Sequence, residues 1–552
     1  LFRSAVALNS RRALPLFCFA RYTMTLAIDF GTSNTVISRW NALSKSPETL
    51  CLEGLSLTQT NLPSLVPSLV YVDKPTLEGV VVGQAVRDRG LDIANDPRFF
   101  RNFKRGIGTP LRGFLPQIEG QAISFEQVGR WFLQRVLAQV RTLAPEEDSL
   151  VLTVPVDSFE AYRLWLEELA RGLEFSQVHL IDEPTAAALG YGLDQERTLL
   201  VLDFGGGTLD WSLVQRPQSS PSSPLGFTLR WGRPSLSQNS TLPPQVARVL
   251  AKAGENLGGI DLDHWLMDYF ENQGIPPSTL VQRLVERLKI NLSHSPVAQE
   301  VYFNDLTLET LTLSLSRQEF EAILARNQFF DRLEQSLNQV LQQGRRQGVG
   351  PEEIEAVLLV GGSAQIPAVQ DWVRRQFPPG RVKTHRPFLA VAEGALQIGQ
   401  NQTLEDFLYH GYGVRYWDRR RNHHNWHLII PPGQPYPMAQ PVELILGASV
   451  EQQPSIELVI GEMEEDRNQT EVYFEEGRLI TRQRSQSGPV VQSLNDQDGA
   501  RAIAQLTPPG FPGNDRVRVQ FQVDGDRLLR ITVEDLLTQE TLVSNQAVVQ
   551  LS

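Results

Sequence analysis

The sequence is poor in cysteine, in positive charge and in long apolar runs. Only two cysteines occur, Cys18 and Cys51, so no disulfide framework holds the fold together and a reducing, cytoplasmic setting is expected. The net charge of −12 disfavours a role in binding nucleic acid, because such proteins usually present a basic surface. No apolar run reaches the roughly 18 residues that a membrane span requires, so we expect no membrane association.

Length and composition indicate a globular protein with more than one domain. A chain of 552 residues exceeds a single ordinary core, and 41% hydrophobic with 21% charged residues argues against disorder. Residues 1–22 contain four arginines and no acidic residue, and Met24 stands just before the first expected strand. We therefore expect residues 1–23 to form an extension outside the fold.

An internal repeat is the most informative pattern in the chain. Two segments, residues 26–38 and 199–214, each read as a strand, a glycine turn and a second strand. In both, an aspartate closes the first strand, Asp29 in one and Asp203 in the other, and Phe-Gly and further small residues follow. The repeat predicts two related lobes, each of which opens with a β-hairpin.

The two glycine turns suit the binding of phosphate groups. Residues 31–34 and 205–208 expose consecutive backbone N–H groups, glycine permits close approach of a ligand, and hydroxyl side chains add donors. A carboxylate beside each turn would repel phosphate unless a cation lay between them, so Asp29 and Asp203 indicate Mg²⁺ held mostly through water. A third turn, Gly361-Gly362-Ser363, follows a buried strand and suits a nucleoside between the lobes.

Hydrophobic periodicity predicts the remaining elements. Apolar residues recur at helical spacing in residues 125–143, 160–173, 280–292 and 317–343. The Ser- and Pro-rich segment 216–244 is expected to be a surface insertion or extended loop. Beyond about residue 405, short alternating strands separated by turn residues predict a small β-sandwich.

The motifs occur in an order that resembles the DnaK-type heat-shock chaperones of the actin, sugar-kinase and chaperone superfamily. The connecting motifs include Leu152-Thr153-Val154-Pro155, Glu183-Pro184-Thr185-Ala186-Ala187-Ala188 and Leu257-Gly258-Gly259. The resemblance covers about residues 24–400, and the motif that begins at Glu183 is nearly diagnostic. It implies an α/β fold, with an actin-like two-lobed ATPase domain of duplicated ribonuclease-H-like lobes followed by an all-β sandwich. It also implies ATP or ADP and Mg²⁺ as cofactors, and hydrolysis of ATP to ADP and phosphate.

The resemblance implies a role for each matching residue. Lys104, Glu183, Asp203 and Thr208 match catalytic positions, with Lys104 reaching the terminal phosphate and the attacking water. Asp29, Asp203 and Asp210 match the carboxylates that hold Mg²⁺, mostly through water. Pro155 and Arg163 match a relay that couples the nucleotide state to the second domain. The nucleotide would contact a larger set: Gly31, Thr32, Ser33, Asn34, Gly205, Gly206, Gly207, Thr208, Gly258, Glu286, Lys289, Ser293, Gly361, Gly362 and Ser363.

The chain departs from the family pattern in three places. Ile290 and Gln365 replace two arginines that enclose the adenine ring, which predicts weaker or less selective base binding, because an arginine over an aromatic ring contributes roughly 0.5–2 kcal/mol. Phe388 replaces an acidic residue that usually follows Pro387. The C-terminal sandwich matches only weakly, and nothing corresponds to the helical lid of the family, so we expect a lidless site that exchanges its ligand quickly.

These observations predict a domain plan and a function. We expect an extension at 1–23, a nucleotide-binding domain at 24–400, a linker at 401–412 and a peptide-binding β-sandwich at 413–552. The predicted function is an ATP-dependent chaperone for unfolded or extended polypeptides, with a J-domain co-chaperone and a nucleotide-exchange factor as further partners. Three alternatives stay open: an actin-like filament or scaffold protein, a nucleotide sensor, and a kinase or phosphatase acting on a small substrate. The intact set of Asp29, Lys104, Glu183, Asp203 and Asp210 favours hydrolysis over sensing.

Overall fold

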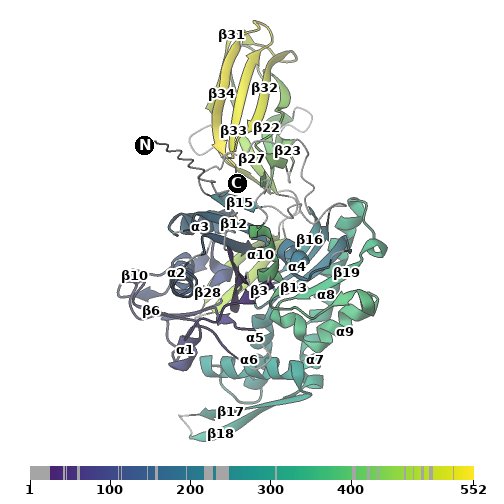
Figure 1. Cartoon of the computed structure of the whole chain (residues 1–552). Helices are drawn as coiled ribbons and strands as arrows, with labels where there is room; N and C mark the ends of the chain where they lie inside the picture. The colour runs from purple at the N-terminus through teal and green to yellow at the C-terminus, as the bar shows by residue number, and fades with distance from the viewer. Residues whose placement is uncertain are drawn as a thin grey trace, which may run out of the picture.

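Two α/β lobes face each other in the computed structural model, and a mainly β C-terminal region follows them (Figure 1). The structure describes residues 25–551 except 42–43, 45, 59–62, 110, 114, 146, 156–159, 174, 194, 217–227, 232–247, 305–307, 401–405, 409, 419–422, 432–433, 465–467, 476–477, 486–489, 496–500 and 526. The expected extension at 1–23 lies outside this part of the chain. Among the described residues, none of the helices has the length and apolar character needed to cross a bilayer.

The first lobe is built on a seven-stranded sheet. Its order is β15-β12-β11-β1-β2-β3, with β4 beside β2. The strands are β1 (Thr25–Phe30), β2 (Asn34–Asn41), β3 (Ser46–Thr49), β4 (Val66–Pro67), β11 (Ser149–Val154), β12 (Gln177–Asp182) and β15 (Thr228–Trp231). Strands β1, β11 and β12 run parallel, whereas β1 and β2 form the expected antiparallel hairpin. Parallel strands are usually covered on both faces, which explains their nearly unbroken apolar sequences.

Helices cover this sheet and a small side sheet extends the lobe. The helical elements are α1 (Gln84–Asp88), η1 (Phe103–Gly106), α2 (Phe125–Leu143), α3 (Glu160–Arg171), α4 (Glu183–Gly190) and α10 (Ala390–Gln400), and the side strands are β5 (Leu69–Val72), β6 (Val80–Val82) and β7 (Phe99–Arg101). Helix α2 begins where Ser124 accepts a hydrogen bond from the N–H of Gln127. Its buried Phe132 stacks on Phe30 of β1, with ring centroids 5.7 Å apart, so the helix is fixed against the strand that carries Asp29.

The second lobe repeats this arrangement. Its five-stranded sheet has the order β16-β14-β13-β19-β20, in which β13 pairs antiparallel with β14 and parallel with β19. The strands are β13 (Thr198–Phe204), β14 (Leu209–Gln215), β16 (Arg248–Glu255), β19 (Ala356–Val360) and β20 (Val382–Lys383). The same hairpin beside a parallel strand thus occurs in both lobes, and the prediction of two related lobes is confirmed.

Helices and a projecting hairpin extend the second lobe (Figure 1). They are α5 (Gly259–Glu271), α6 (Thr279–His294), β17 (Val297–Asn304), β18 (Glu309–Ser316), α7 (Arg317–Arg326), α8 (Phe329–Arg346), η3 (Gly362–Gln365) and α9 (Pro367–Gln376). Residues 317–343 are helical as expected, but they form two helices, α7 and α8. Gln328 adopts a left-handed conformation with φ of 56° between α7 and α8, and this conformation ends one helix and starts the next.

Two four-stranded sheets form most of the C-terminal region. One has the order β23-β22-β27-β30 and the other β25-β32-β33-β34. The strands are β22 (Gly411–Asp418), β23 (His423–Ile430), β25 (Val442–Gly447), β27 (Ile460–Glu464), β30 (Val490–Ser493), β32 (Asp515–Val523), β33 (Leu528–Asp535) and β34 (Thr541–Gln550). A further pair is formed by β26 (Gln453–Leu458) and β31 (Arg501–Gly510). Tyr412, Ile460, Val519, Phe521 and Ile531 are buried in one apolar cluster, as a β-sandwich requires.

Some strands pair with partners far away in the sequence. Strand β15 lies inside the Ser- and Pro-rich insertion, so the expectation of a loop is wrong for residues 228–231, which pair with β12. The hairpin of β28 (Asn468–Glu475) and β29 (Arg478–Ser485) pairs through β28 with β8 (Leu111–Gly113), shortly after η1. Within the expected linker, β21 (Asp406–Leu408) pairs with β24 (Gln434–Tyr436).

Helices α4 and α10 pack closely enough to exclude side chains at their crossing. A Cβ atom at Gly394 would overlap the carbonyl oxygen of Ala186, and one at Gly190 would overlap that of Ala390. Both obstacles are backbone atoms, which cannot rotate away. Because α4 begins at Glu183, this contact also helps to fix the cleft.

We predict that Gly394→Ala lowers the melting temperature, with a loss of about 1–3 kcal/mol in stability, because overpacking forces backbone shifts. Calorimetry of the purified chain measures the change. Gly380→Ala is the matched control, since a Cβ atom there has no neighbour within 4 Å. Equal melting temperatures for the two variants would contradict the described packing of α4 on α10.

Candidate functional site

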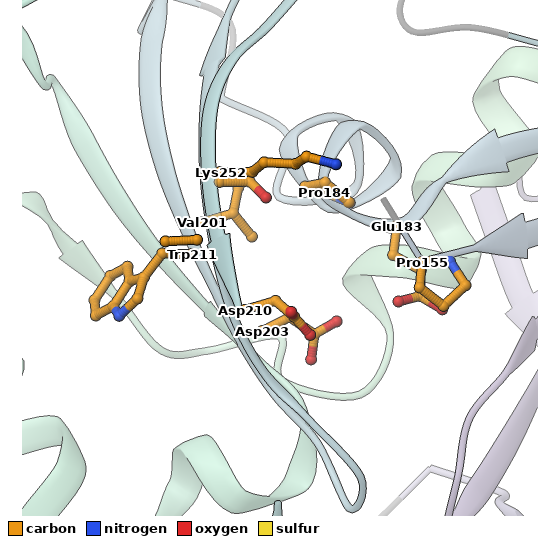
Figure 2. Close-up of a pocket in the computed structure, with 10 residues that line it drawn as sticks. Pro155, Glu183, Pro184, Val201, Asp203, Asp210, Trp211 and Lys252 are labelled. Atoms are coloured by element: carbon orange, nitrogen blue, oxygen red, sulfur yellow. The ribbon is translucent and has the colours of Figure 1, made fainter. Parts of the chain in front are cut away.

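Carboxylates from both lobes gather where the two hairpins turn. Asp29 lies near the end of β1, and Asp203 near the end of β13 lies directly opposite Asp210 of β14. Figure 2 shows the Asp203 and Asp210 side chains together, pointing towards Glu183 and Pro155 across the pocket. The pocket is lined by Pro155, Glu183, Pro184, Val201, Asp203, Asp210, Trp211, Ser212, Lys252 and Ala253.

An ion pair between Lys104 and Glu183 joins two distant segments of the first lobe at this pocket. Lys104 Nζ lies 3.0 Å from Glu183 Oε1, and both side chains are largely buried. Glu183 opens helix α4, whose N-terminus is capped by Asp182 accepting a 2.8 Å hydrogen bond from the N–H of Thr185. Lys104 sits on η1, 5.6 Å from the ring centre of Phe30. The predicted catalytic pair therefore lies between rigid elements.

Burial and mutual repulsion alter the protonation of the aspartates. Burial, followed by the nearby Glu183 carboxylate, raises the pKa of Asp29 from 3.8 to about 6, although Lys104 and a hydrogen bond from Thr153 act in the opposite direction. Burial and then Glu183, Asp210 and Asp29 raise the pKa of Asp203 well above its usual range. Such crowding of carboxylates is unfavourable unless a cation offsets it.

The two phosphate turns face each other at close range. A methyl group on Gly207 would lie 2.6 Å from Thr32 Oγ1, and one on Gly206 would overlap Ser33 Oγ. The N–H of Gly205 donates to the carbonyl of Thr208, at 3.2 Å, which closes the second turn. Of the other predicted positions in these turns, Gly31 would clash through a Cβ atom with the carbonyl of Asn34, and Gly258 with the backbone of Gly206.

The third predicted turn packs onto the second. Gly361 has a φ of 86°, a conformation that favours glycine, and Ser363 Oγ donates to the carbonyl of Gly205 at 2.8 Å. A methyl group on Gly362 would lie 3.1 Å from the ring of Phe388. The structure thus brings together the three glycine turns that the sequence singled out.

The predicted nucleoside helix, α6, presents side chains that already have protein partners. Lys289 Nζ lies 2.7 Å from Asp263 Oδ1 and donates to the carbonyl of Gly259 at 2.6 Å. Glu286 is held by Arg87 at 3.0 Å and by Arg101 at 3.8 Å. Ser293 lies on the last turn of α6, where its Oγ is 3.5 Å from the carbonyl of Lys289.

The two positions expected to weaken base binding differ in exposure. Ile290 is 45% exposed on α6, and Gln365 is half-buried at the end of η3. Neither carries a charge, so the cation over the base that the resemblance would imply is absent at these two described positions.

Several ion pairs join the lobes on the α5–α6 side of the cleft. Arg105, next to Lys104 on η1, donates to the carbonyl of Asn256 at 3.0 Å and to Asp261 of α5 at 3.2 Å. Arg283 of α6 bonds Asp92 of the first lobe at 3.1 Å. Together with Arg87–Glu286, these contacts hold the lobes in register around the site.

Pro155, one of the two expected relay residues, lies at the pocket. Pro155 follows β11 and lines the pocket beside Glu183. Arg163 lies on α3, but its side chain is outside the described part of the structure.

Sequence reasoning missed the residues that hold the predicted ones in place. Thr153 donates a 2.8 Å hydrogen bond to Asp29, and a lone polar residue within the apolar run 150–154 was a usable signal for it. Arg87, Arg101 and Asp263 gave no such signal. Their partners, Glu286 and Lys289, lie on α6 and are not near them in the sequence.

The donor set suits a hydrated cation. Among the described residues, no three carboxylate, imidazole or thiol groups converge closely enough to bind one ion directly. Carboxylates with raised pKa values nevertheless surround the facing glycine turns, and this combination fits Mg²⁺ that keeps several waters and is also held by phosphate oxygens.

We predict that Asp29→Asn stabilises the ligand-free protein at pH 7.5 by up to about 3 kcal/mol, the free energy that corresponds to a pKa of about 6 instead of 3.8. The raised pKa means that the native protein binds the proton more tightly than the unfolded chain. Wild-type stability therefore falls as pH rises from about 4 to 6, and the advantage of the variant grows over the same window.

Melting temperatures measured between pH 4 and pH 8 test this prediction. Glu78→Gln, at an exposed position, is the control and should show no such window. A variant that melts below the wild type at pH 7.5 and gains nothing between pH 4 and 6 would refute it.

Comparison with known proteins agrees with this geometry. The family model described as "Hsp70 protein" matches residues 114–218 and 245–404, which leaves residues 219–244 between the two matched parts. Similar curated proteins include "Chaperone protein HscA" of Salmonella heidelberg (strain SL476), of Salmonella schwarzengrund (strain CVM19633) and of Salmonella dublin. Each is 26% identical over 553 aligned residues, which cover 93% of this chain and 76% of the relative. The chain is therefore similar to the Hsp70 proteins, which are ATP-dependent chaperones that hydrolyse ATP with Mg²⁺.

Proposed function

We propose that this chain is a DnaK-type chaperone in which ATP hydrolysis in the cleft controls the binding of extended polypeptides to the C-terminal sandwich. The observation that carries the proposal is the 3.0 Å ion pair between Lys104 and Glu183. It lies beside Asp29 and Asp203, the carboxylates at the two facing glycine turns.

Lys104 supplies a fixed positive charge in this proposal. Burial alone would lower the pKa of Lys104, but Glu183, Tyr162 and Asp29 raise it above its usual value. The side chain therefore stays protonated at neutral pH and can stabilise negative charge that develops on a transferred phosphoryl group. Thr208 and Thr32 stand at the turns, where their hydroxyls can donate to phosphate oxygens.

Carboxylates orient water in the same pocket. Glu183 and Asp203 accept hydrogen bonds and can hold a water in line for attack, while Thr153 fixes the orientation of Asp29. Bound Mg²⁺ supplies charge neutralisation for the phosphates, and Asp29, Asp203 and Asp210 would hold its water shell.

The nucleoside would lie against Gly361, Gly362 and Ser363 and along α6. Glu286 and Lys289 are held by arginine and aspartate partners, so their polar side chains are already fixed in place for contact with the nucleoside. With Ile290 and Gln365 in place of charged residues, we infer that ATP binds with less selectivity for its base.

Two exposed apolar side chains on one face of the sandwich support polypeptide binding. On the β22–β23 hairpin, Trp417 pairs with His424, Arg415 with Trp426 and Gly413 with Leu428 in register, so these residues share one face. Trp417 is 43% exposed and Leu428 is 46% exposed. An extended apolar segment could bury both side chains on binding.

The proposal also assigns roles to the larger parts of the chain. Residues 24–400 bind and hydrolyse the nucleotide, residues 401–412 link the domains, and residues 413–552 bind polypeptide. A J-domain co-chaperone and a nucleotide-exchange factor are the partners that the similarity to Hsp70 proteins favours, and the scarcity of cysteine favours a cytoplasmic location.

Lys104→Ala should lower the single-turnover rate of ATP hydrolysis by about 100-fold or more, because a preorganised charge at the transferred group is lost. ATP affinity should change much less. Lys74→Ala, at an exposed position, should hydrolyse like the wild type, and chelation of Mg²⁺ should stop both. Hydrolysis by Lys104→Ala at the wild-type rate would contradict the assignment.

The wild-type protein also decides between the alternative functions. A wild type that binds ATP without hydrolysing it would favour the nucleotide sensor, and one that binds no ATP would favour the scaffold protein.

Replacing Trp417 by Ala and Leu428 by Ser together should weaken binding of an extended apolar peptide by about 10-fold or more, since two exposed anchors are lost. Fluorescence anisotropy with a labelled peptide measures the change. Leu537→Ser removes an even more exposed side chain, 62% accessible, elsewhere on the sandwich, and should bind normally. Equal affinities for the two variants would place the peptide site on another face.

A further inference from the structure

The segment from residue 216 to residue 247 leaves the second lobe and returns to it. Strand β14 ends at Gln215 and β16 begins at Arg248, and these two residues are paired in register. A turn of two residues would therefore be enough to join the strands. Instead the chain inserts a long segment, most of which falls in the stretch between the two parts matched by the Hsp70 family model.

Within this segment, strand β15 belongs to the first lobe. It pairs antiparallel with β12 over four positions, from Val178↔Trp231 to Ile181↔Thr228. Without β15, strand β12 would be the edge of its sheet and would leave a row of backbone groups unpaired. The insertion, which continues the chain between β14 and β16 of the second lobe, thus adds a strand to the sheet of the first lobe.

Strand β12 leads directly to the catalytic pocket. It ends at Asp182, whose side chain caps α4, and the next residue is Glu183, the partner of Lys104. On its other side β12 pairs with β11, whose Thr153 holds Asp29. Any shift of β12 along or out of the sheet would therefore move the carboxylate that the proposed mechanism uses.

The opposite side of β15 faces the connection to the sandwich. Strand β21, within the expected linker, lies in contact with β15, and Figure 1 shows β15 at the end of the first lobe nearest the sandwich. Linker strand, β15, β12 and Glu183 therefore follow one another as a continuous series of neighbours.

We propose that β15 acts as an interlobe strap, which positions Glu183 through β12 and transmits the position of the linker to the catalytic pocket. Its effect on Glu183 follows from the pairing alone. Its response to polypeptide rests on the proposed function.

The test replaces residues 216–247 by Asn-Gly in the full chain, which retains the β14–β16 hairpin. Amide hydrogen exchange should become about 10-fold or more faster in β12 and in the first turn of α4, because the outer amides of β12 lose their partners. Single-turnover ATP hydrolysis should fall by about 10- to 100-fold at saturating ATP, because Glu183 is displaced. The affinity for ATP should stay within about 2-fold, since β15, the strand of this segment that the structure describes, pairs with β12 and not with a glycine turn. Acceleration of hydrolysis by an extended peptide should disappear.

A pair of point variants covers the case in which the shortened chain does not fold. Leu229→Pro places a proline in the middle of β15, where it removes an N–H group and disfavours the pairing. Leu225→Pro makes the same chemical change before the strand begins. The first variant should reproduce the effects of the deletion, and the second should not.

Two outcomes would overturn the proposal. If amide exchange in β12 is unchanged, β15 does not hold β12 in place. If exchange becomes faster in β12 while exchange in α4 and ATP hydrolysis stay unchanged, β15 does not position Glu183. If the wild type itself shows no hydrolysis, the proposed function fails, and exchange in β12 and α4 still decides whether the strap exists and reaches Glu183.

Discussion

Asp29, Glu183, Asp203 and Asp210 bring four carboxylates to one place between the lobes, and their repulsion is the constraint on which the surrounding structure depends. Burial and this repulsion raise the pKa values of Asp29 and Asp203. The 3.0 Å contact of Lys104 with Glu183 offsets part of the charge. A hydrated divalent cation with its phosphate ligands would offset the rest, so the same unfavourable charge that destabilises the empty protein provides affinity for Mg²⁺ and nucleotide.

Such a site must be held from both lobes. The first lobe provides Asp29, Lys104 and Glu183, and the second provides Asp203 and Asp210. Arg105 joins η1 to α5, and Arg87 joins the first lobe to Glu286 of α6. These long-range ion pairs are partly or largely buried, where loss of one partner leaves an unpaired charge, so the lobes are locked in one arrangement while the pairs are intact. The strap adds a backbone connection at the opposite side, next to the linker.

The parts of the fold that depend on local sequence could be predicted. The hairpins that carry Asp29 and Asp203 follow from glycine turns between alternating strands, and α2 was expected at its observed bounds because its apolar spacing is a local signal. Helix over 317–343 was also expected, but the break between α7 and α8 was not, because a single left-handed residue, Gln328, makes it and no glycine or proline marks it.

Pairings between distant segments could not be predicted in this way. Nothing within residues 228–231 indicates that they complete the sheet of the other lobe, and β28 meets β8 across most of the chain. The same limit applies to the site. Charged residues of the glycine motifs were found from their own patterns, whereas Arg87, Arg101 and Asp263 became visible only when the fold placed them against Glu286 and Lys289.

The central claim is that nucleotide in the cleft controls polypeptide binding on the sandwich. The most direct measurement is the dissociation rate of a labelled extended peptide from the full chain, with Mg²⁺ and either ATP or ADP present. The account predicts that the peptide dissociates much faster with ATP than with ADP, and that Lys104→Ala, which retains ATP, stays in the fast-releasing state. Equal dissociation rates with the two nucleotides would show that the cleft and the sandwich work independently, and would contradict the account.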